Sequence, residues 1–243
     1  MPAPESRIDF YRRWGALNAP YFRWQFEQFA PYTGKRIADI GCGLGNFLPF
    51  LKKAECYLGF EPDAALRQEF QKHCNVPGII LSPCHDITDT RAAAALKTHA
   101  VDTILCINVL EHIEKDAQAL NNMIEGLSPG GHLCLLVPAL QALYGSLDRL
   151  DGHYRRYDRD KLLELASAAA GSRARVVKCR YMNFPGVFGW FLKSKILKET
   201  SQKDENYRLM NTILPVVAAV EKLIPPPLGM SLVLVLKKET MFP

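Results

Sequence analysis

Residues 38–47 read ADIGCGLGNF and place glycines at positions 41, 43 and 45, directly after a short apolar run. Glycine lacks the Cβ atom that would keep a ligand away, so the backbone N–H groups of such a loop can approach a bound molecule closely. The stretch therefore predicts a strand, a ligand-binding loop and then a helix, as in nucleotide-binding α/β folds. By itself the loop fits a dinucleotide as well as another adenosine-containing molecule.

Two acidic residues distinguish between these ligands. Glu61 follows the first glycine by about 20 residues, at the end of the next predicted strand, where a carboxylate can accept both hydroxyls of an adenosine ribose. Asp39 stands just before the first glycine, where it would repel a pyrophosphate and attract an ammonium group. The spacing G-x-G-x-G, with Asn46 where dinucleotide folds have a glycine, points the same way. These features favour S-adenosylmethionine, which carries an ammonium group and no phosphate, over NAD(P).

The composition is that of an ordinary globular chain with one main domain. The 243 residues are 48% hydrophobic and 23% charged, and the net charge of +5 is spread without a long basic run, so we expect no nucleic-acid partner. The seven cysteines include no C-x-x-C pair, so we expect reduced thiols, no metal site and a cytoplasmic protein. The first residues, MPAPESRIDF, lack a signal-peptide pattern, and no apolar stretch reaches transmembrane length.

Five short β-rich runs alternate with amphipathic stretches, which predicts a parallel sheet with helices on both faces. Two further β-rich runs follow, so we expect a doubly wound, Rossmann-like α/β fold with a seven-stranded sheet. We expect an S-adenosylmethionine-binding core over residues 36–181 that is completed by a last strand within 230–243. Residues 1–35 are expected to form an N-terminal helical cap, or lid, and residues 182–229 a helical insertion that caps the substrate. The expected strands are Arg36–Ile40, Cys56–Phe60, Gly78–Leu81, Val101–Ile107, His132–Val137, Ala174–Tyr181 and Met230–Lys237.

The stretches IADIGCGLGNF, YLGFEPD, CHDIT and VDTILCINVLEHI together resemble the class I S-adenosylmethionine-dependent methyltransferases over residues 35–137. The resemblance implies that the cofactor's methionine end lies against the glycine loop, that Glu61 holds the ribose, and that the residues after the second and third strands flank the adenine. It also implies that the end of the fourth strand faces the reacting centre, while Glu111 orders the loop that follows. The implied cofactor-binding residues are Asp39, Gly41, Cys42, Gly43, Glu61, Pro62, Asp86, Ile87, Asn108 and Val109. From the residues alone, Asp86 is equally explained as a helix N-cap.

The stretch YGSLDRLDGHYRRYDRD, residues 144–160, carries the candidates for acceptor chemistry, since it follows the fifth strand at the ligand-binding end of the sheet. His153 is the candidate general base, with Tyr154 beside it as a second catalytic candidate. The candidate substrate contacts are His112, Tyr144, Arg155, Arg156 and Tyr157. The alternative is that the two arginines form ion pairs with nearby acids and order the loop.

These features predict transfer of a methyl group from S-adenosylmethionine to an oxygen, or with less support a nitrogen or carbon, of a small or lipid-linked acceptor. Residues 137–157 and the ending PPPLGMSLVLVLKK are similar to a bacterial subgroup that accompanies glycosyltransferases and lipid or glycan assembly. Residues 181–198 have an aromatic first half and a basic second half, typical of contact with the inner membrane face or of a helix pair packed on the domain. The alternatives for function are a non-catalytic binding module and an NAD(P)-dependent oxidoreductase.

Overall fold

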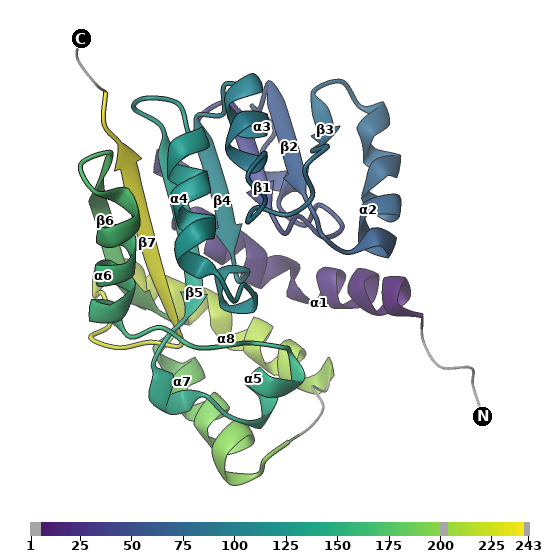
Figure 1. The fold of residues 1–243 in the computed structure, drawn as a ribbon. Coiled ribbons are helices and arrows are strands. Elements are labelled where there is room, and N and C mark those ends of the chain that lie inside the picture. Colours follow the sequence, from purple (N-terminus) through teal and green to yellow (C-terminus); the bar gives the residue numbers. More distant parts are fainter. Residues whose placement is uncertain (1–5, 200–203, 241–243) are drawn as a thin grey trace.

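The computed structural model describes residues 6–199 and 204–240. Its centre is a seven-stranded sheet in the order β3-β2-β1-β4-β5-β7-β6, with helices on both faces (Figure 1). The predicted strands are confirmed to within two residues at either end. They are β1 (Arg36–Ile40), β2 (Cys56–Phe60), β3 (Ile79–Leu81), β4 (Thr103–Ile107), β5 (His132–Pro138), β6 (Ala174–Met182) and β7 (Ser231–Lys238).

The sheet is mixed: the parallel pairing predicted for the first five strands is confirmed, and the last two strands, whose direction the sequence left open, pair in an antiparallel arrangement. Strands β1 to β5 pair in parallel, whereas β7 is antiparallel to both of its neighbours, β5 and β6. Met182 at the end of β6 pairs with Ser231 at the start of β7. The insertion between them therefore leaves and returns at the same end of the sheet, and the chain must run back in the opposite direction.

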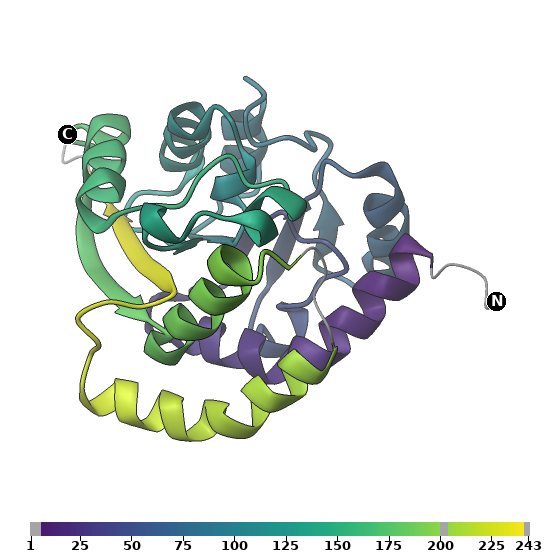
Figure 2. The ribbon, with the colours of Figure 1, turned by 90° about the horizontal axis from the view of Figure 1, so that it is seen from below.

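Each face of the sheet is covered by its own set of helices. Helices α3, α4 and α6 pack on one face around Leu96, Leu120 and Leu162, while α1, α2 and α8 pack on the other around Trp24 and Phe70. Figure 2 shows α1 and α8 running side by side. The described helices are α1 (Arg7–Glu27), α2 (Ala64–Phe70), α3 (Ala92–Thr98), α4 (Asp116–Gly126), α5 (Ser146–Leu150), α6 (Arg159–Ala170), α7 (Phe184–Trp190) and α8 (Asp204–Leu223).

Helix α1 packs against the glycine loop as well as on the sheet. The rings of Phe22 and Phe47 lie 5.6 Å apart, and Trp24 is buried in the core. A Cβ atom added to Gly15 would lie 2.9 Å from Oδ1 of Asn46. The helix therefore supports the loop from outside, and its role as a lid over a cofactor stays a prediction.

The glycine loop does not lead into an α-helix, contrary to the sequence expectation. Between the loop and β2 the chain makes turns and one short 3-10 helix, Leu48–Phe50. Gly45 has a φ of +81°, which a right-handed helix cannot accommodate, and Pro49 has no backbone N–H to donate to a longer helix. The loop is held instead by the side chains of Phe47 and Leu51, which are buried.

The insertion consists of α7, a π-helical turn over Phe191–Ile196, and α8. It is tied to the end of β6 by Glu221 of α8, whose carboxylate accepts hydrogen bonds from the backbone N–H groups of Asn183 and Phe184 at 2.9 and 2.8 Å. Among the helices of residues 6–199 and 204–240, none combines the length and apolarity that crossing a bilayer requires.

Candidate cofactor and acceptor site

A pocket of about 340 Å³ opens at the C-terminal ends of β1 and β2, between the loops that follow β3 and β4. Parallel α/β sheets bind their ligands at this edge. Five predicted cofactor residues line the pocket: Gly41, Pro62, Asp86, Ile87 and Val109. His112, predicted to contact substrate, lines it as well. The pocket also includes residues that the sequence reasoning missed, namely Ile40, Phe60, His85, Thr88, Ile113, Glu114 and Lys115.

Glu61 is fixed beside the glycine loop by two backbone donors. Its Oε2 atom accepts a hydrogen bond from the N–H of Gly43, and its Oε1 atom accepts one from the N–H of Asp63, both at 2.9 Å. Burial raises the pKa of Glu61, and these two donors oppose that rise. Each carboxylate oxygen keeps a lone pair. Glu61 is 5% exposed and is not among the residues that line the pocket, so its contact with the two hydroxyls of a ribose stays a prediction.

The glycine loop lies close to its neighbours at Gly41 and Cys42. Gly41 has a φ of +69°, and an added Cβ atom would lie 2.6 Å from Cγ2 of Val109, so the loops after β1 and β4 approach closely here. The N–H groups of Gly41 and Cys42 both donate to the carbonyl oxygen of Phe60, at 2.8 and 3.0 Å. The Cys42 side chain is buried, and burial raises the pKa of its thiol.

Asp39 is placed differently from the expectation. Its side chain is 2% exposed and accepts a hydrogen bond from the hydroxyl of Tyr57 on the face covered by α1, α2 and α8. Burial raises the pKa of this carboxyl from 3.8 to about 7, and the charge of Glu61 contributes to the rise. Asp39 therefore lies beneath the loop rather than on the pocket lining, and its contact with the ammonium group of a ligand stays a prediction.

The loop after β3 presents Asp86 to the pocket. Its Oδ1 atom accepts hydrogen bonds from the N–H and the hydroxyl of Thr88, at 2.8 and 2.9 Å. Helix α3 begins only at Ala92, so Asp86 is not its N-cap. The nearby Nδ1 atom of His85 is buried and has no hydrogen-bond partner among the residues that the structure describes. Asn108, which follows β4, is exposed and has a φ of +53°.

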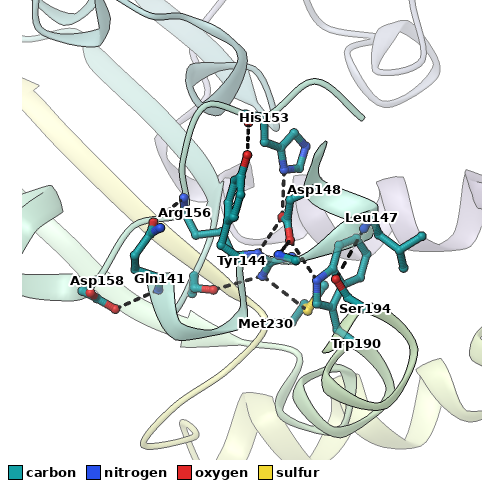
Figure 3. Close-up of polar contacts among 12 residues, drawn as sticks. Gln141, Tyr144, Leu147, Asp148, His153, Arg156, Asp158, Trp190, Ser194 and Met230 are labelled. Carbon is teal, nitrogen blue, oxygen red and sulfur yellow. Dashed lines mark hydrogen bonds and ion pairs between the residues drawn. The ribbon is translucent and has the colours of Figure 1, made fainter. Parts of the chain in front are cut away.

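The loops after β4 and β5 meet beside this pocket. The N–H of Tyr154 donates to the carbonyl oxygen of Glu111 at 2.8 Å, and the rings of His112 and His153 lie edge to face at 4.6 Å. Nδ1 of His153 lies 3.0 Å from Oδ1 of Asp148, and the hydroxyl of Tyr144 donates to the carbonyl oxygen of His153 (Figure 3). The structure thus brings His112 and His153 together, whereas the Tyr154 side chain is exposed.

The charge on Asp148 decides which nitrogen of His153 is free. Burial alone would raise the pKa of Asp148, but the hydrogen bond from His153 and the charge of Arg156 lower it below its usual value. Asp148 is therefore ionised and accepts the Nδ1–H of His153, which leaves the Nε2 lone pair available. The neighbouring Glu111 is buried, and burial raises the pKa of its carboxyl to about 7.

The predictions that Arg155, Arg156 and Tyr157 contact substrate are corrected by the structure. Arg156 is buried; its Nε donates to Asp148 at 2.7 Å, and its guanidinium lies over the Trp190 ring (Figure 3). The buried hydroxyl of Tyr157 donates to Asp116 at 3.0 Å, and Arg155 pairs with the same carboxylate at 2.6 Å. The two arginines thus form ion pairs with acids, as the alternative proposed, and Tyr157 is held by Asp116 as well.

Comparison with known proteins identifies the family. A family model described as a methyltransferase domain matches residues 17–173. The chain belongs to the methyltransferase domain family. The matched residues include strands β1 to β5, the pocket and the joined loops, and the assignment replaces the oxidoreductase alternative. By family and fold it is a class I S-adenosylmethionine-dependent methyltransferase.

Among curated proteins, this methyltransferase is similar to a ubiquinone biosynthesis O-methyltransferase from Ralstonia nicotianae, with 26% identity over 118 residues. The match covers 48% of each protein, so the chain spans about half the length of that relative. An S-adenosylmethionine-dependent methyltransferase from Mesorhizobium loti has the same fold, with a TM-score of 0.60, 14% identity, and coverage of 90% of this chain and 98% of that one. The N-methyltransferase NodS from Bradyrhizobium japonicum, solved with S-adenosylhomocysteine, has a TM-score of 0.51, 14% identity, and coverage of 98% and 90%.

We expect Glu61→Ala to weaken binding of S-adenosylmethionine on the order of 100-fold, because it removes two hydrogen bonds from the ribose to a charged acceptor. Isothermal titration calorimetry with S-adenosylmethionine and S-adenosylhomocysteine measures this loss. Glu55→Ala is the matched control, since Glu55 is an exposed acid that pairs with Lys35. Equal affinities of the wild type and Glu61→Ala would contradict the assignment.

Asp39 is expected to make stability fall as the pH rises. Because its pKa is about 7 in the folded protein and about 4 when unfolded, the folded state binds more protons between these values. The stabilisation is complete below about pH 4 and is lost as the pH rises through about 7. Asp39→Asn keeps an acceptor for Tyr57 and should reduce the fall in melting temperature between about pH 5 and 8.

Melting temperatures from circular dichroism measure this effect. Asp89→Asn is the control, since the hydrogen bond from Arg91 lowers the pKa of Asp89 to about 2, outside that range. A wild-type melting curve with the same pH dependence as that of Asp39→Asn would refute the role of Asp39.

Proposed function

We propose that this protein transfers a methyl group from S-adenosylmethionine to a hydroxyl oxygen of a small or lipid-linked acceptor. The observation that carries the proposal is His153, whose Nδ1 contacts the buried Asp148 and whose ring lies against His112, a residue of the pocket. Methyl transfer is an in-line displacement from an activated sulfonium, so it requires alignment and, for a hydroxyl, removal of a proton.

The atom methylated is proposed from chemistry and from the curated relatives. An imidazole with a free ring nitrogen suits a hydroxyl acceptor, because it can take the proton as the oxygen attacks the methyl carbon. The names of two relatives, from Ralstonia nicotianae and Schizosaccharomyces pombe, specify O-methyltransferases of ubiquinone biosynthesis. We propose His153 as the base and residues 1–35 and 182–229 as caps around the acceptor; residues 1–5 and 200–203 of these ranges lie outside the described residues.

We expect His153→Ala to bind S-adenosylmethionine with unchanged affinity and to turn over acceptors on the order of 100-fold more slowly. The assay uses methyl-labelled S-adenosylmethionine with a panel of phenols, sugars and prenyl phosphates, and mass spectrometry identifies the atom methylated. His73→Ala, which changes an exposed histidine outside the pocket, is the control. Full turnover by His153→Ala would remove His153 as the base, and cofactor binding without any turnover would support the non-catalytic module.

A second proposal concerns location. The insertion exposes Phe188 and Phe191 at 62% and 48%, and the same segment carries Lys193, Lys195 and Lys198. Exposed aromatic side chains beside lysines are typical of segments that lie in the interface of an anionic membrane. We propose that residues 181–198 contact such a surface and so bring the site to a lipid-linked acceptor.

We expect the protein to sediment with vesicles that contain anionic phospholipid more than with phosphatidylcholine vesicles, and less strongly as salt is added, because added salt screens the lysines. The double variant Phe188→Ser and Phe191→Ser should lose most of this binding. Phe10→Ser is the matched control, since Phe10 is an exposed phenylalanine of α1. Equal sedimentation of the double variant and the wild type would refute the membrane contact.

A further inference from the structure

The side chains of Glu111, His112 and His153 form a cluster that the methyl-transfer assignment does not explain. Each offers one ligand atom, and the three atoms all lie within 4.8 Å of one another. The cluster joins the loop after β4 to the loop after β5, and His112 also lines the pocket. The absence of a C-x-x-C pair predicts no metal site, but this cluster contains no cysteine, and packing brings His153 to Glu111 and His112 from about 40 residues further along the chain.

Glu111 supplies a second observation that points to a ligand. Its side chain is 1% exposed, and its Oε2 atom has no hydrogen-bond partner within residues 6–199 and 204–240. Leaving a buried carboxylate oxygen without a partner is costly, so such an atom implies a group that is held there in the working protein. A metal cation is one of the groups that offset this cost.

The rings of His153 and His112 are oriented like those of histidines that bind metal ions. Asp148 accepts the Nδ1–H of His153, which fixes the tautomer and leaves Nε2 to coordinate, as in the carboxylate–histidine–metal arrangement of many sites. The ring of His112 has a hydrogen bond with the backbone of Gly152.

From these contacts we propose that Glu111, His112 and His153 bind a divalent first-row transition-metal cation of the zinc type, with the acceptor's oxygen completing its coordination. Two histidines and one carboxylate with an open position form a common catalytic set for such cations. Ligand atoms at about 2.1 Å from one tetrahedral cation lie about 3.4 Å apart, so each pair of ligand atoms within 4.8 Å needs to approach by at most about 1.4 Å.

This inference rests on the proposed methyl transfer and changes how the acceptor loses its proton. The cation lowers the pKa of the bound hydroxyl, and its proton leaves to water. The oxygen's electron pair forms the new bond to the methyl carbon, while the pair of the C–S bond stays on sulfur and yields S-adenosylhomocysteine. With the cation bound, His153 serves as its ligand rather than as the base.

The test is titration of chelator-treated full-length protein with Co²⁺, followed by visible absorption, and with Zn²⁺, followed by equilibrium dialysis. We expect one cation per wild-type chain. His112→Ala and His153→Ala should each lose affinity by on the order of 100-fold or more, since the loss of an outer hydrogen bond alone costs 10- to 100-fold. His112 is exposed, so its variant should fold; circular dichroism checks this, and His73→Ala is the matched control.

Wild-type protein that binds neither cation would overturn the proposal, as would equal binding by the wild type, His112→Ala and His153→Ala. The affinity for S-adenosylmethionine is measured in parallel on the same wild-type protein. Cofactor binding and turnover without metal binding would refute the metal site and leave the proposed function standing. Metal binding without cofactor binding would refute the proposed function instead.

Discussion

The buried carboxylate of Asp148 holds together the part of this methyltransferase that surrounds its candidate acceptor site. It lies within hydrogen-bond distance of four donors: Nε of Arg156, Nδ1 of His153, the N–H of Gly145 and Nε1 of Trp190 (Figure 3). These donors come from the loop after β5 and from the insertion. Removing one partner of a buried ion pair costs about 3 to 5 kcal/mol, so this carboxylate fixes both segments at once.

The same carboxylate links structure to chemistry through His153. Because Asp148 is ionised, it sets the tautomer of His153 and leaves the other ring nitrogen available. Arg156, by contrast, has a structural role. It pairs with Asp148, donates to the carbonyl oxygen of Ala139 and lies over the Trp190 ring. His153 and Arg156 come from the same short stretch but have different roles. One ring nitrogen of His153 stays available, whereas the Arg156 guanidinium is buried and bound to protein groups.

The residues at the cofactor end of the site are brought together by the ends of parallel strands. Parallel strands β1, β2 and β4 end at one edge of the sheet, so the residues directly after them meet whatever their distance in sequence. Gly41, Pro62 and Val109 could therefore be predicted as neighbours from strand positions alone. Residues such as Ile113 and Lys115 could not, because they line the pocket through the path of a loop that has no periodic pattern.

Sequence alone determined the strand positions, the glycine loop and the carboxylate after β2, because hydrophobic periodicity and the lack of a Cβ atom are local properties. It did not determine that β7 runs antiparallel, that Asp39 lies under the loop beside Tyr57, or that Arg156 is buried. Those three outcomes depend on how the described parts of residues 1–35 and 182–229 pack against the sheet and its loops. The cluster of Glu111, His112 and His153 likewise exists only after two loops have packed together, since contacts between distant residues are set by tertiary packing and not by spacing along the chain.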